Sequence, residues 1–231
     1  MTLRLPRMTA GASTLIARLS AALLAIAAGA CSSEGGGDWR GLFDTVRDSW
    51  ENRDAPVSLA EASSIPYSTL GIRIGSAREQ ILVLATDTGG DRLWTSAARI
   101  AILTRGGRIV GTAGLPGNIS NYASQSGAGS SWFTARRVSW TADFADLGVF
   151  SASVTCQDVP AAHEPTTILG QEFNTMRIDE TCTSDQLNWN FANTYWVSSS
   201  TGRVWRSIQY IHPNMDPLEI QILRPPNSPD Q

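Results

Sequence analysis

Short runs of hydrophobic residues, separated by turn-forming residues, dominate the middle of the chain and are densest between residues 81 and 115. Two glycine-containing segments, 87–91 and 105–108, divide this region, and glycine tolerates the positive φ that a tight hairpin turn requires. Apolar runs this short between turns are typical of strands. The pattern therefore predicts an antiparallel meander with strands at 81–86, 92–95, 99–104 and 109–112.

The same pattern continues on both sides of the meander. Pro66 favours the start or edge of a strand, because proline cannot donate to a sheet ladder. Residues 116–131 are rich in Gly, Ser and Asn, which predicts a long loop with a short helical turn near Tyr122. Leu147 and Gly148 belong to a further turn. The other predicted strands are 65–73, 132–143, 149–156, 188–198, 203–213 and 218–223.

Helical spacing is convincing in one segment, residues 38–53. Trp39, Val46 and Trp50, together with Leu42 or Phe43, recur at steps of three and four residues, and Asp38 is a suitable N-cap. We expect the apolar stripe to pack on the sheet. A helix that binds a partner or a membrane surface stays an alternative, although its polar face mixes acidic and basic residues. A second, short helical turn is predicted at 58–63.

These elements together predict the fold class. Strand-like runs follow one another with hairpin signals between many of them, and no alternating helix pattern supports a parallel sheet. We expect a mainly β protein, with one antiparallel, strongly curved or barrel-like sheet and one N-terminal α-helix packed on it.

The N-terminal thirty residues have the pattern of a secretion signal. They contain Arg4, Arg7 and Arg18, no acidic residue, and an apolar run at 19–30, which is shorter than the roughly 20 residues of a membrane-spanning helix. The run ends in Ala-Gly-Ala before Cys31, which is similar to a bacterial lipobox, where the signal is cut before the cysteine and the cysteine is acylated. The alternative is an ordinary signal peptide cleaved near Ala30 that leaves a spare cysteine.

Domain boundaries follow from this N-terminal region. Residues 1–30 are the expected lipoprotein signal peptide, and 31–37, Cys-Ser-Ser-Glu-Gly-Gly-Gly, are too polar and glycine-rich to fold and suit a flexible tether. Residues 38–231 are expected to form a single β-rich periplasmic domain. Ser32 after the cysteine resembles the sorting pattern of outer-membrane lipoproteins, and multiple acyl chains anchor a protein firmly.

Charge and cysteine content limit the remaining possibilities. Of 18 basic residues three lie in the signal, while all 21 acidic residues lie beyond it, so a nucleic-acid partner is disfavoured. Cys156 and Cys182 are an even pair in an exported chain and predict a disulfide, which would stabilise the fold by roughly 3–4 kcal/mol through loop entropy. Two free thiols are the alternative. A zinc site is disfavoured, because these two cysteines lack the further ligands that zinc needs.

Several segments are similar to one known family. Trp94-Thr95-Ser96 and residues 107–115 resemble the YjbF/GfcB family of bacterial exopolysaccharide lipoproteins. So do the Pro-aromatic strand at 65–73 and the hairpin that carries Tyr195-Trp196-Val197, Gly202, Val204-Trp205-Arg206-Ser207, Gln209 and Pro213. The candidate binding residues within these segments are Trp94, Arg108, Trp196, Trp205, Arg206 and Gln209.

The resemblance also implies a function, and no cofactor or metal is expected. It implies an outer-membrane lipoprotein, anchored through Cys31 and facing the periplasm, that acts as an accessory protein in group 4 capsule or exopolysaccharide export. The implied partners are an outer-membrane β-barrel and other products of an exopolysaccharide operon. A carbohydrate-binding module is the alternative, because Trp and Arg suit sugar contacts as well as protein interfaces. Most of the eight tryptophans are expected in the core.

Enzymatic activity has weak support from the sequence. His163, in a predicted polar loop near Pro165, and His212, before Pro213, have no evident catalytic neighbours and are assigned structural roles. The acidic pairs Asp143 with Asp146 and Asp179 with Glu180 have the residue types of a glycosidase, which needs one proton donor and one base or nucleophile. We interpret these pairs as solvated loop residues and expect no catalytic site.

Overall fold

The computed structural model describes residues 56–124 and 132–226, which belong to one compact unit, Ser49–Gln231. A separate unit, residues 1–48, lies outside the described residues. The predicted signal peptide 1–30, Cys31, the tether 31–37 and the helix 38–53 therefore lie outside the described part of the chain. They stay predictions.

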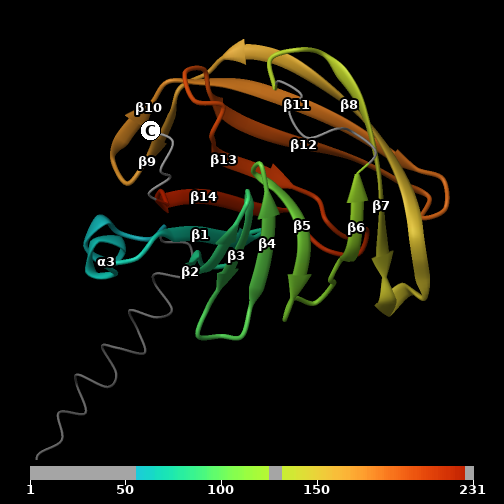
Figure 1. Cartoon of the computed structure of the whole chain (residues 1–231), viewed down its shortest axis with the longest axis horizontal. Coiled ribbons are helices and arrows are strands. Elements are labelled where there is room, and N and C mark those ends of the chain that lie inside the picture. The colour runs from blue at the N-terminus through green and yellow to red at the C-terminus, as the bar shows by residue number, and fades with distance from the viewer. Residues whose placement is uncertain (1–55, 125–131, 227–231) are drawn as a thin grey trace, which may run out of the picture. The chain divides into compact units, whose positions relative to one another are not determined.

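Antiparallel strands dominate the described unit, as Figure 1 shows. Its helical elements are α3 (Leu59–Ser64) and a 3-10 turn, η1 (Ala145–Leu147). Two short strands, β9 (Thr166–Ile168) and β10 (Gln171–Phe173), form a separate hairpin. The other strands are β1 (Thr69–Ile74), β2 (Gln80–Thr88), β3 (Asp91–Thr95), β4 (Ala101–Arg105), β5 (Arg108–Ala113), β6 (Ser120–Ser124), β7 (Arg136–Phe144), β8 (Val149–His163), β11 (Thr175–Ser184), β12 (Trp189–Ser198), β13 (Val204–Gln209) and β14 (Leu218–Arg224).

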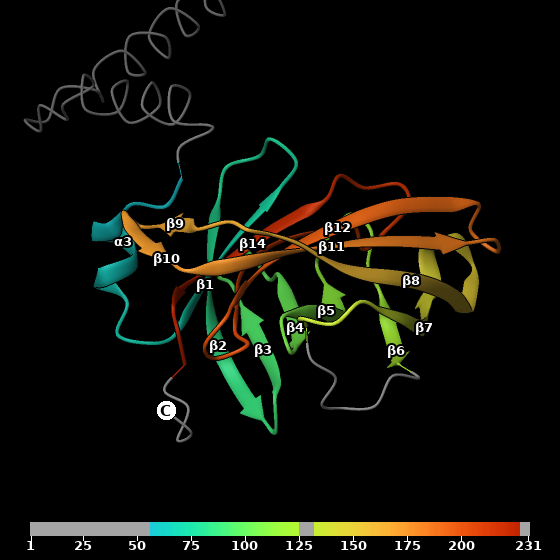
Figure 2. The same cartoon turned by 90° about the horizontal axis from the view of Figure 1, so that it is seen from above.

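These strands form one 12-stranded sheet in the order β5-β4-β3-β2-β1-β14-β13-β12-β11-β8-β7-β6. Neighbours are consecutive in sequence except where β1 pairs with β14 and where the β9–β10 hairpin separates β8 from β11. The sheet curves until its two edges, β5 and β6, lie side by side (Figures 1 and 2). There the amide of Thr112 donates to the carbonyl of Ile119 at 3.0 Å. The predicted antiparallel, barrel-like sheet is confirmed.

The concave side of this sheet holds the core. Alternate residues of a strand point to opposite faces, and in β7 the buried residues are Val138, Trp140, Ala142 and Phe144. One large cluster of buried apolar side chains draws on both halves of the sheet. Of the tryptophans in the described residues, Trp94, Trp140, Trp189 and Trp196 are buried, and Trp132 and Trp205 are partly buried.

Some predicted elements differ from the structure. The residues around Tyr122 form strand β6 instead of a helical turn, because they pair with β7. Strand β8 continues to His163, which was predicted in a loop. Strands β9, β10 and β11 were not predicted. The buried positions of β11 include Thr175, Glu180 and Ser184, so its sequence lacks the hydrophobic alternation of a typical strand.

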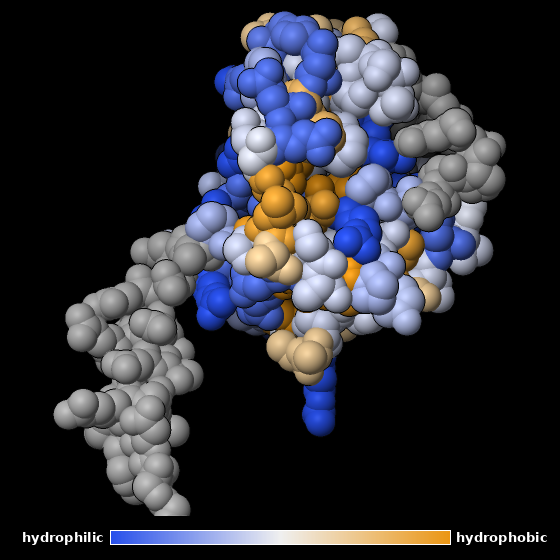
Figure 3. Space-filling view, turned by 90° about the vertical axis from the view of Figure 1, so that its left-hand side faces the viewer, coloured by the Kyte–Doolittle hydropathy of each residue, from blue (hydrophilic) through white to orange (hydrophobic). Residues whose placement is uncertain are grey.

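Helix α3 agrees with the predicted short helical turn. Ser58 and Glu61 form a capping box, in which the Ser58 hydroxyl accepts from the Glu61 amide and the Glu61 carboxylate accepts from the Ser58 amide. Leu59 on this helix is 60% exposed. The side of the molecule that carries α3 shows hydrophobic residues at the surface, bordered by hydrophilic ones (Figure 3).

Candidate functional site

A cavity of about 510 Å³ lies between two hairpin turns, the β4–β5 turn at Gly106 and Gly107 and the β12–β13 turn at 200–202. Four core side chains line it from β1, β3 and β14: Leu70, Trp94, Ile220 and Ile222. Three arginines also line it, Arg92, Arg203 and Arg206. We refer to it as the arginine-lined cavity.

Glycine allows the two turns to come close together. Gly106 and Gly107 have φ values of +55° and +87°, which favour glycine strongly. A Cβ atom on Gly107 would lie 2.4 Å from a methyl carbon of Val204, so only glycine permits this approach of the β4–β5 turn to β13. Gly202, with φ +69°, serves the β12–β13 turn.

Arg92 and Trp94 project from the same face of β3, since they are two residues apart. The indole N–H of Trp94 donates to Thr104 Oγ1 at 2.9 Å, which fixes the buried ring. Nε of Arg92 donates to Asp87 at 2.8 Å. Trp94 is 1% exposed and therefore forms part of the cavity floor without offering an open ring face.

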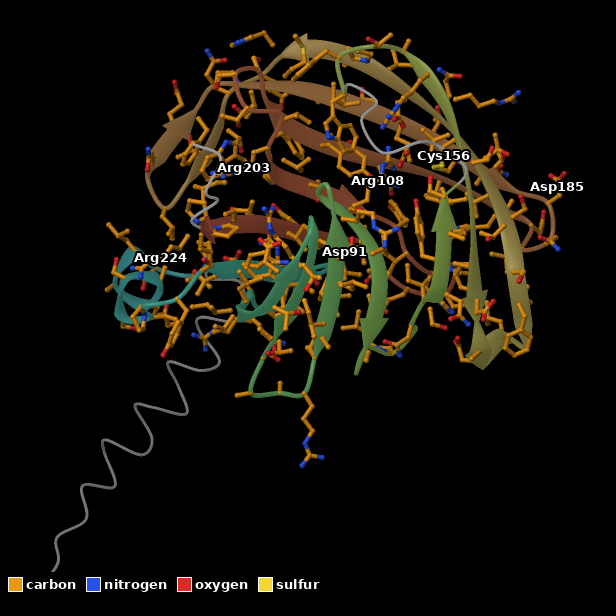
Figure 4. The ribbon with its side chains drawn as sticks, in the orientation of Figure 1. Asp91, Arg108, Cys156, Asp185, Arg203 and Arg224 are labelled. Atoms are coloured by element: carbon orange, nitrogen blue, oxygen red, sulfur yellow. A yellow bond between two sulfur atoms is a disulfide. The ribbon has the colours of Figure 1, made fainter. Side chains whose placement is uncertain are left out.

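Arg203 immediately precedes β13, and its guanidinium carbon is 5.3 Å from the centre of the Trp205 ring. The Trp205 ring stacks in turn on Phe173 of β10, with ring centres 3.9 Å apart. Burial lowers the pKa of Arg203, and the positive charge of Arg92 lowers it further. Figure 4 shows Arg203 and Arg108 between the β11–β12 arch and the β2–β5 strands.

A second group of charged residues is buried on the concave side of the sheet. Arg108 of β5 donates to Asp158 of β8 at 3.0 and 3.1 Å and also binds Glu180 of β11. Arg136 donates to Asp158 at 2.7 Å. Asn193 and Tyr195 donate to Glu180 at 2.7 and 3.0 Å. We call these six residues the buried ion cluster, and the side chains of both acids are fully buried.

The two carboxyl groups of this cluster differ in proton affinity. Burial alone would raise the pKa of Asp158, but hydrogen bonding with Glu180 and the charges of Arg108 and Arg136 lower it. Burial raises the pKa of Glu180, and the neighbouring Asp158 carboxylate raises it further, while Arg108 opposes this shift. The fold therefore favours an ionised Asp158 beside a Glu180 that binds protons more tightly than usual.

This cluster binds strands together and leaves no room for a sugar. The cavity bordered by Arg108, Glu180 and Tyr195 has a volume of only about 20 Å³. Trp132 covers two of the cations, with the guanidinium carbons of Arg108 and Arg136 at 4.8 and 5.6 Å from its ring centre. The arrangement links β5 to β8, β11 and β12 from the inside.

The acidic pairs considered for hydrolysis do not form pairs in the structure. Asp179 and Glu180 are consecutive in β11 and point to opposite faces, and Asp179 binds Arg177. The interpretation of Glu180 as a solvated loop residue was wrong, because Glu180 is buried in a strand. Asp143 accepts from the Ser151 amide, whereas Asp146 lies 3.0 Å from Nε2 of the buried His212.

The predicted binding residues lie in four different places. Trp94, Trp205 and Arg206 line the arginine-lined cavity, and Arg108 belongs to the buried ion cluster. Gln209 connects β13 to the β4–β5 hairpin, since it accepts from the Ile109 amide at 2.9 Å and donates to the Gly107 carbonyl at 2.9 Å.

Trp196 and Arg206 meet on the convex face of the sheet. The Arg206 guanidinium lies 4.6 Å from the Trp196 ring centre, and its Nε donates to Glu219 at 2.7 Å. The Trp196 indole N–H donates to Glu164 at 3.0 Å. The guanidinium of Arg206 is thus bound to Glu219, although the residue also borders the arginine-lined cavity.

Sequence reasoning missed Arg92 and Arg203 in the cavity and Asp158, Glu180 and Tyr195 in the ion cluster. For Arg92 a signal was present, because it is two residues from the selected Trp94 in a predicted strand. Arg203 likewise precedes the selected Trp205 in a predicted hairpin.

Cys156 and Cys182 are opposite one another in β8 and β11 and are joined by a disulfide, with their Cα atoms 4.1 Å apart. Glu180 lies near both sulfur atoms. A disulfide has no thiolate to offer a metal, so this group does not suit metal binding. Within residues 56–124 and 132–226, no helix has the length and apolar character needed to cross a bilayer.

Comparison with known proteins gives a consistent result. A family model described as "Group 4 capsule polysaccharide lipoprotein gfcB, YjbF" matches residues 23–223. The uncharacterized lipoprotein GfcB of Escherichia coli (strain K12) is 27% identical over 198 residues, which cover 80% of this chain and 89% of GfcB. The crystal structure of the hypothetical lipoprotein YmcC from Escherichia coli (K12) matches with a TM-score of 0.59 and 22% identity, over 85% of this chain and 100% of YmcC, and supports the fold.

Proposed function

The chain belongs to the YjbF family of group 4 capsule polysaccharide lipoproteins, and from this we propose that it is a lipid-anchored accessory protein of capsule or exopolysaccharide export. It acts at the outer membrane, faces the periplasm, and binds other proteins of its operon, including an outer-membrane β-barrel. It performs no catalysis. The family match over residues 23–223 carries this proposal, because it includes Cys31 as well as all of the β-sheet except Arg224.

The fold supports a binding role. The described sheet is cross-linked by a disulfide and by the buried ion cluster, so it presents rigid surfaces at a small cost in conformational entropy. The acidic residues that have glycosidase-type chemistry are engaged by different partners, as described above. These features suit a protein that holds partners in place.

Acylation of Cys31 would confine the domain near the membrane. Confinement raises its effective concentration around a membrane-bound partner, so even modest intrinsic affinity suffices for assembly. The short glycine-rich segment after Cys31 lets the domain reorient while it stays within reach of the membrane.

Crosslinking in intact cells, followed by affinity isolation from the envelope, tests the proposal. We expect the acylated protein to co-isolate with an outer-membrane β-barrel of its own operon. Cys31→Ser should lose the acyl chains and the membrane association, reduce polymer export, and leave the fold intact. Arg137→Gln, a change at an exposed position of β7, is the matched control and should behave like the wild type.

Two results would contradict this function. One is recovery of abundant, unrelated lipoproteins alone. The other is a Cys31→Ser protein that stays membrane-bound, keeps its signal peptide and fully supports export.

A further inference from the structure

The charges that line the arginine-lined cavity are all positive. Arg92 and Arg203 supply these charges, since the guanidinium of the third lining arginine, Arg206, is bound to Glu219 on the convex face, and none of the described lining residues is Asp or Glu. Asp87 binds Arg92, and Glu219 binds Arg206, but neither acid is part of the lining. Burial lowers the pKa of Arg203, and the nearby positive charge of Arg92 lowers this pKa further. A bound anion would relieve this repulsion.

Arg203 is held in place before any ligand arrives. Its guanidinium lies over the Trp205 ring at 5.3 Å, and that ring is itself stacked on Phe173 at 3.9 Å. A guanidinium fixed by a ring loses little further freedom on binding. Its planar set of N–H donors matches the two oxygens of a carboxylate, which it binds more specifically than an ammonium group does.

The remaining lining is suited to hydroxyl groups. Ser200 and Thr201 are exposed at the β12–β13 turn, and Ser207 lies on the inner face of β13. The volume of about 510 Å³ falls within the range of about 300–1,000 Å³ typical of small-molecule sites. A single inorganic anion would leave most of this space empty, whereas a sugar unit that bears an acidic group offers hydroxyls as well as charge.

We propose that the arginine-lined cavity binds a carboxylate-bearing sugar unit of an acidic polysaccharide. Arg203 and Arg92 recognise the carboxylate, the hydroxyl groups of the β12–β13 turn contact the sugar hydroxyls, and the apolar floor excludes water beneath the ring. The proposed export function supplies the source of such a polymer. The binding chemistry depends only on the cavity.

Binding of defined oligosaccharides to the purified full-length lipoprotein in detergent tests this directly. The probe is a tetrasaccharide of galacturonic acid, and the comparison ligand is its carboxyl-reduced form, a tetrasaccharide of galactose. We expect saturable binding of the acidic probe that weakens as salt increases, and affinity at least about tenfold lower for the reduced form. Inorganic phosphate, as a free anion, should compete only weakly.

Substitutions distinguish binding in the cavity from binding through general surface charge. Arg203→Gln and Arg92→Gln should each weaken binding of the acidic probe by about tenfold or more, because each removes a charge-assisted contact. Arg137→Gln, with the same change of charge on an exposed part of β7, should bind like the wild type. Thermal melting verifies that each variant is folded. Arg203→Lys keeps the positive charge and the aliphatic stem, and it should still lose affinity because it lacks the planar donors.

Three outcomes would overturn the inference: equal affinity for the acidic and reduced probes, equal loss in Arg137→Gln, or folded Arg203 and Arg92 variants with unchanged affinity. These outcomes are independent of the proposed function. A protein that binds the acidic probe but isolates with no export partner contradicts only the accessory role. A protein that isolates with its partner but does not bind the probe contradicts only the cavity assignment.

Discussion

Arg108 of β5 donates from one nitrogen to both carboxylate oxygens of Asp158 of β8, at 3.0 and 3.1 Å. Strand β5 is one edge of the sheet, and β8 is the third strand from the other edge, β6. The pair therefore connects the two ends of the curved sheet from the inside. It acts where β5 and β6 lie side by side without being paired neighbours in the sheet.

Asp158→Asn should destabilise the protein by about 3–5 kcal/mol, because it leaves two largely buried arginines beside a single acid. The side chain of Asp158 is fully buried, and both Arg108 and Arg136 bind it. Urea denaturation at neutral pH measures the change in the free energy of unfolding. Asp91→Asn is the control: Asp91 binds Arg105 at 2.6 Å on the surface, and its loss should cost less than about 1 kcal/mol. Similar losses in the two variants would contradict a special role for the buried ion cluster.

Glu180→Gln should cost less than Asp158→Asn at neutral pH. The raised pKa of Glu180 means that its site favours the neutral carboxyl, which a glutamine resembles, whereas the lowered pKa of Asp158 means that its site favours the charge. The measurement is the same urea denaturation of both variants. A larger loss in Glu180→Gln would show that the assignment of the two proton affinities is reversed.

The stability difference between the wild type and Glu180→Gln should depend on pH. Because the folded pKa of Glu180 lies above its unfolded value of about 4.3, the folded state binds the proton more tightly. The stability that Glu180 contributes is fully present below its pKa in the unfolded chain, and it is lost as pH rises through its pKa in the folded protein. The wild type should therefore gain stability relative to the variant as pH falls from 7 towards 4. Asp158 has a lowered pKa, so its contribution to stability changes with pH in the opposite direction, and it does so in both the wild type and the variant. A difference that does not change with pH would contradict the raised pKa.

Gly107→Ala should be more destabilising than Gly106→Ala. Both residues have positive φ, which costs alanine roughly 1–2 kcal/mol. A Cβ atom at 107 would in addition lie 2.4 Å from Val204, whereas a Cβ atom at 106 meets nothing within 4 Å, so overpacking adds about 1–3 kcal/mol at 107 alone. Urea denaturation of the two variants provides the comparison. Equal losses would mean that the β4–β5 turn moves away from β13 without cost.

Replacing both Cys156 and Cys182 with serine should lower stability by about 3–4 kcal/mol under oxidising conditions, because the disulfide that links these residues, 26 positions apart, restricts the unfolded chain. Thermal or urea denaturation with and without reductant measures this effect. The difference from the wild type should nearly vanish in reductant. If it persists there, the serine substitutions act through packing in the core instead of through the cross-link.

The sequence alone determined the local elements of this fold. Short apolar runs and paired glycines located the meander β2–β5 and the hairpin β12–β13, because these signals depend on residues close together in the chain. Hydrophobic alternation failed for β11, where the buried positions include Thr175, Glu180 and Ser184. The carboxyl group of Glu180 is buried together with partners on other strands, Arg108 on β5 and Asn193 and Tyr195 on β12, and local sequence does not reveal those partners.

Tertiary structure alone decided which distant residues meet. The pairing of β1 with β14 and the curvature of the sheet bring Arg108 to Asp158, 50 positions away, and to Glu180, 72 positions away. The curved sheet also places Arg92 of β3 and Arg203, just before β13, on one cavity. Residue type indicated that arginine and tryptophan were available for binding. Strand register and sheet curvature, which are non-local properties of the packed chain, determined that Arg108 is bound by buried acids while Arg92 and Arg203 line a space large enough for a ligand.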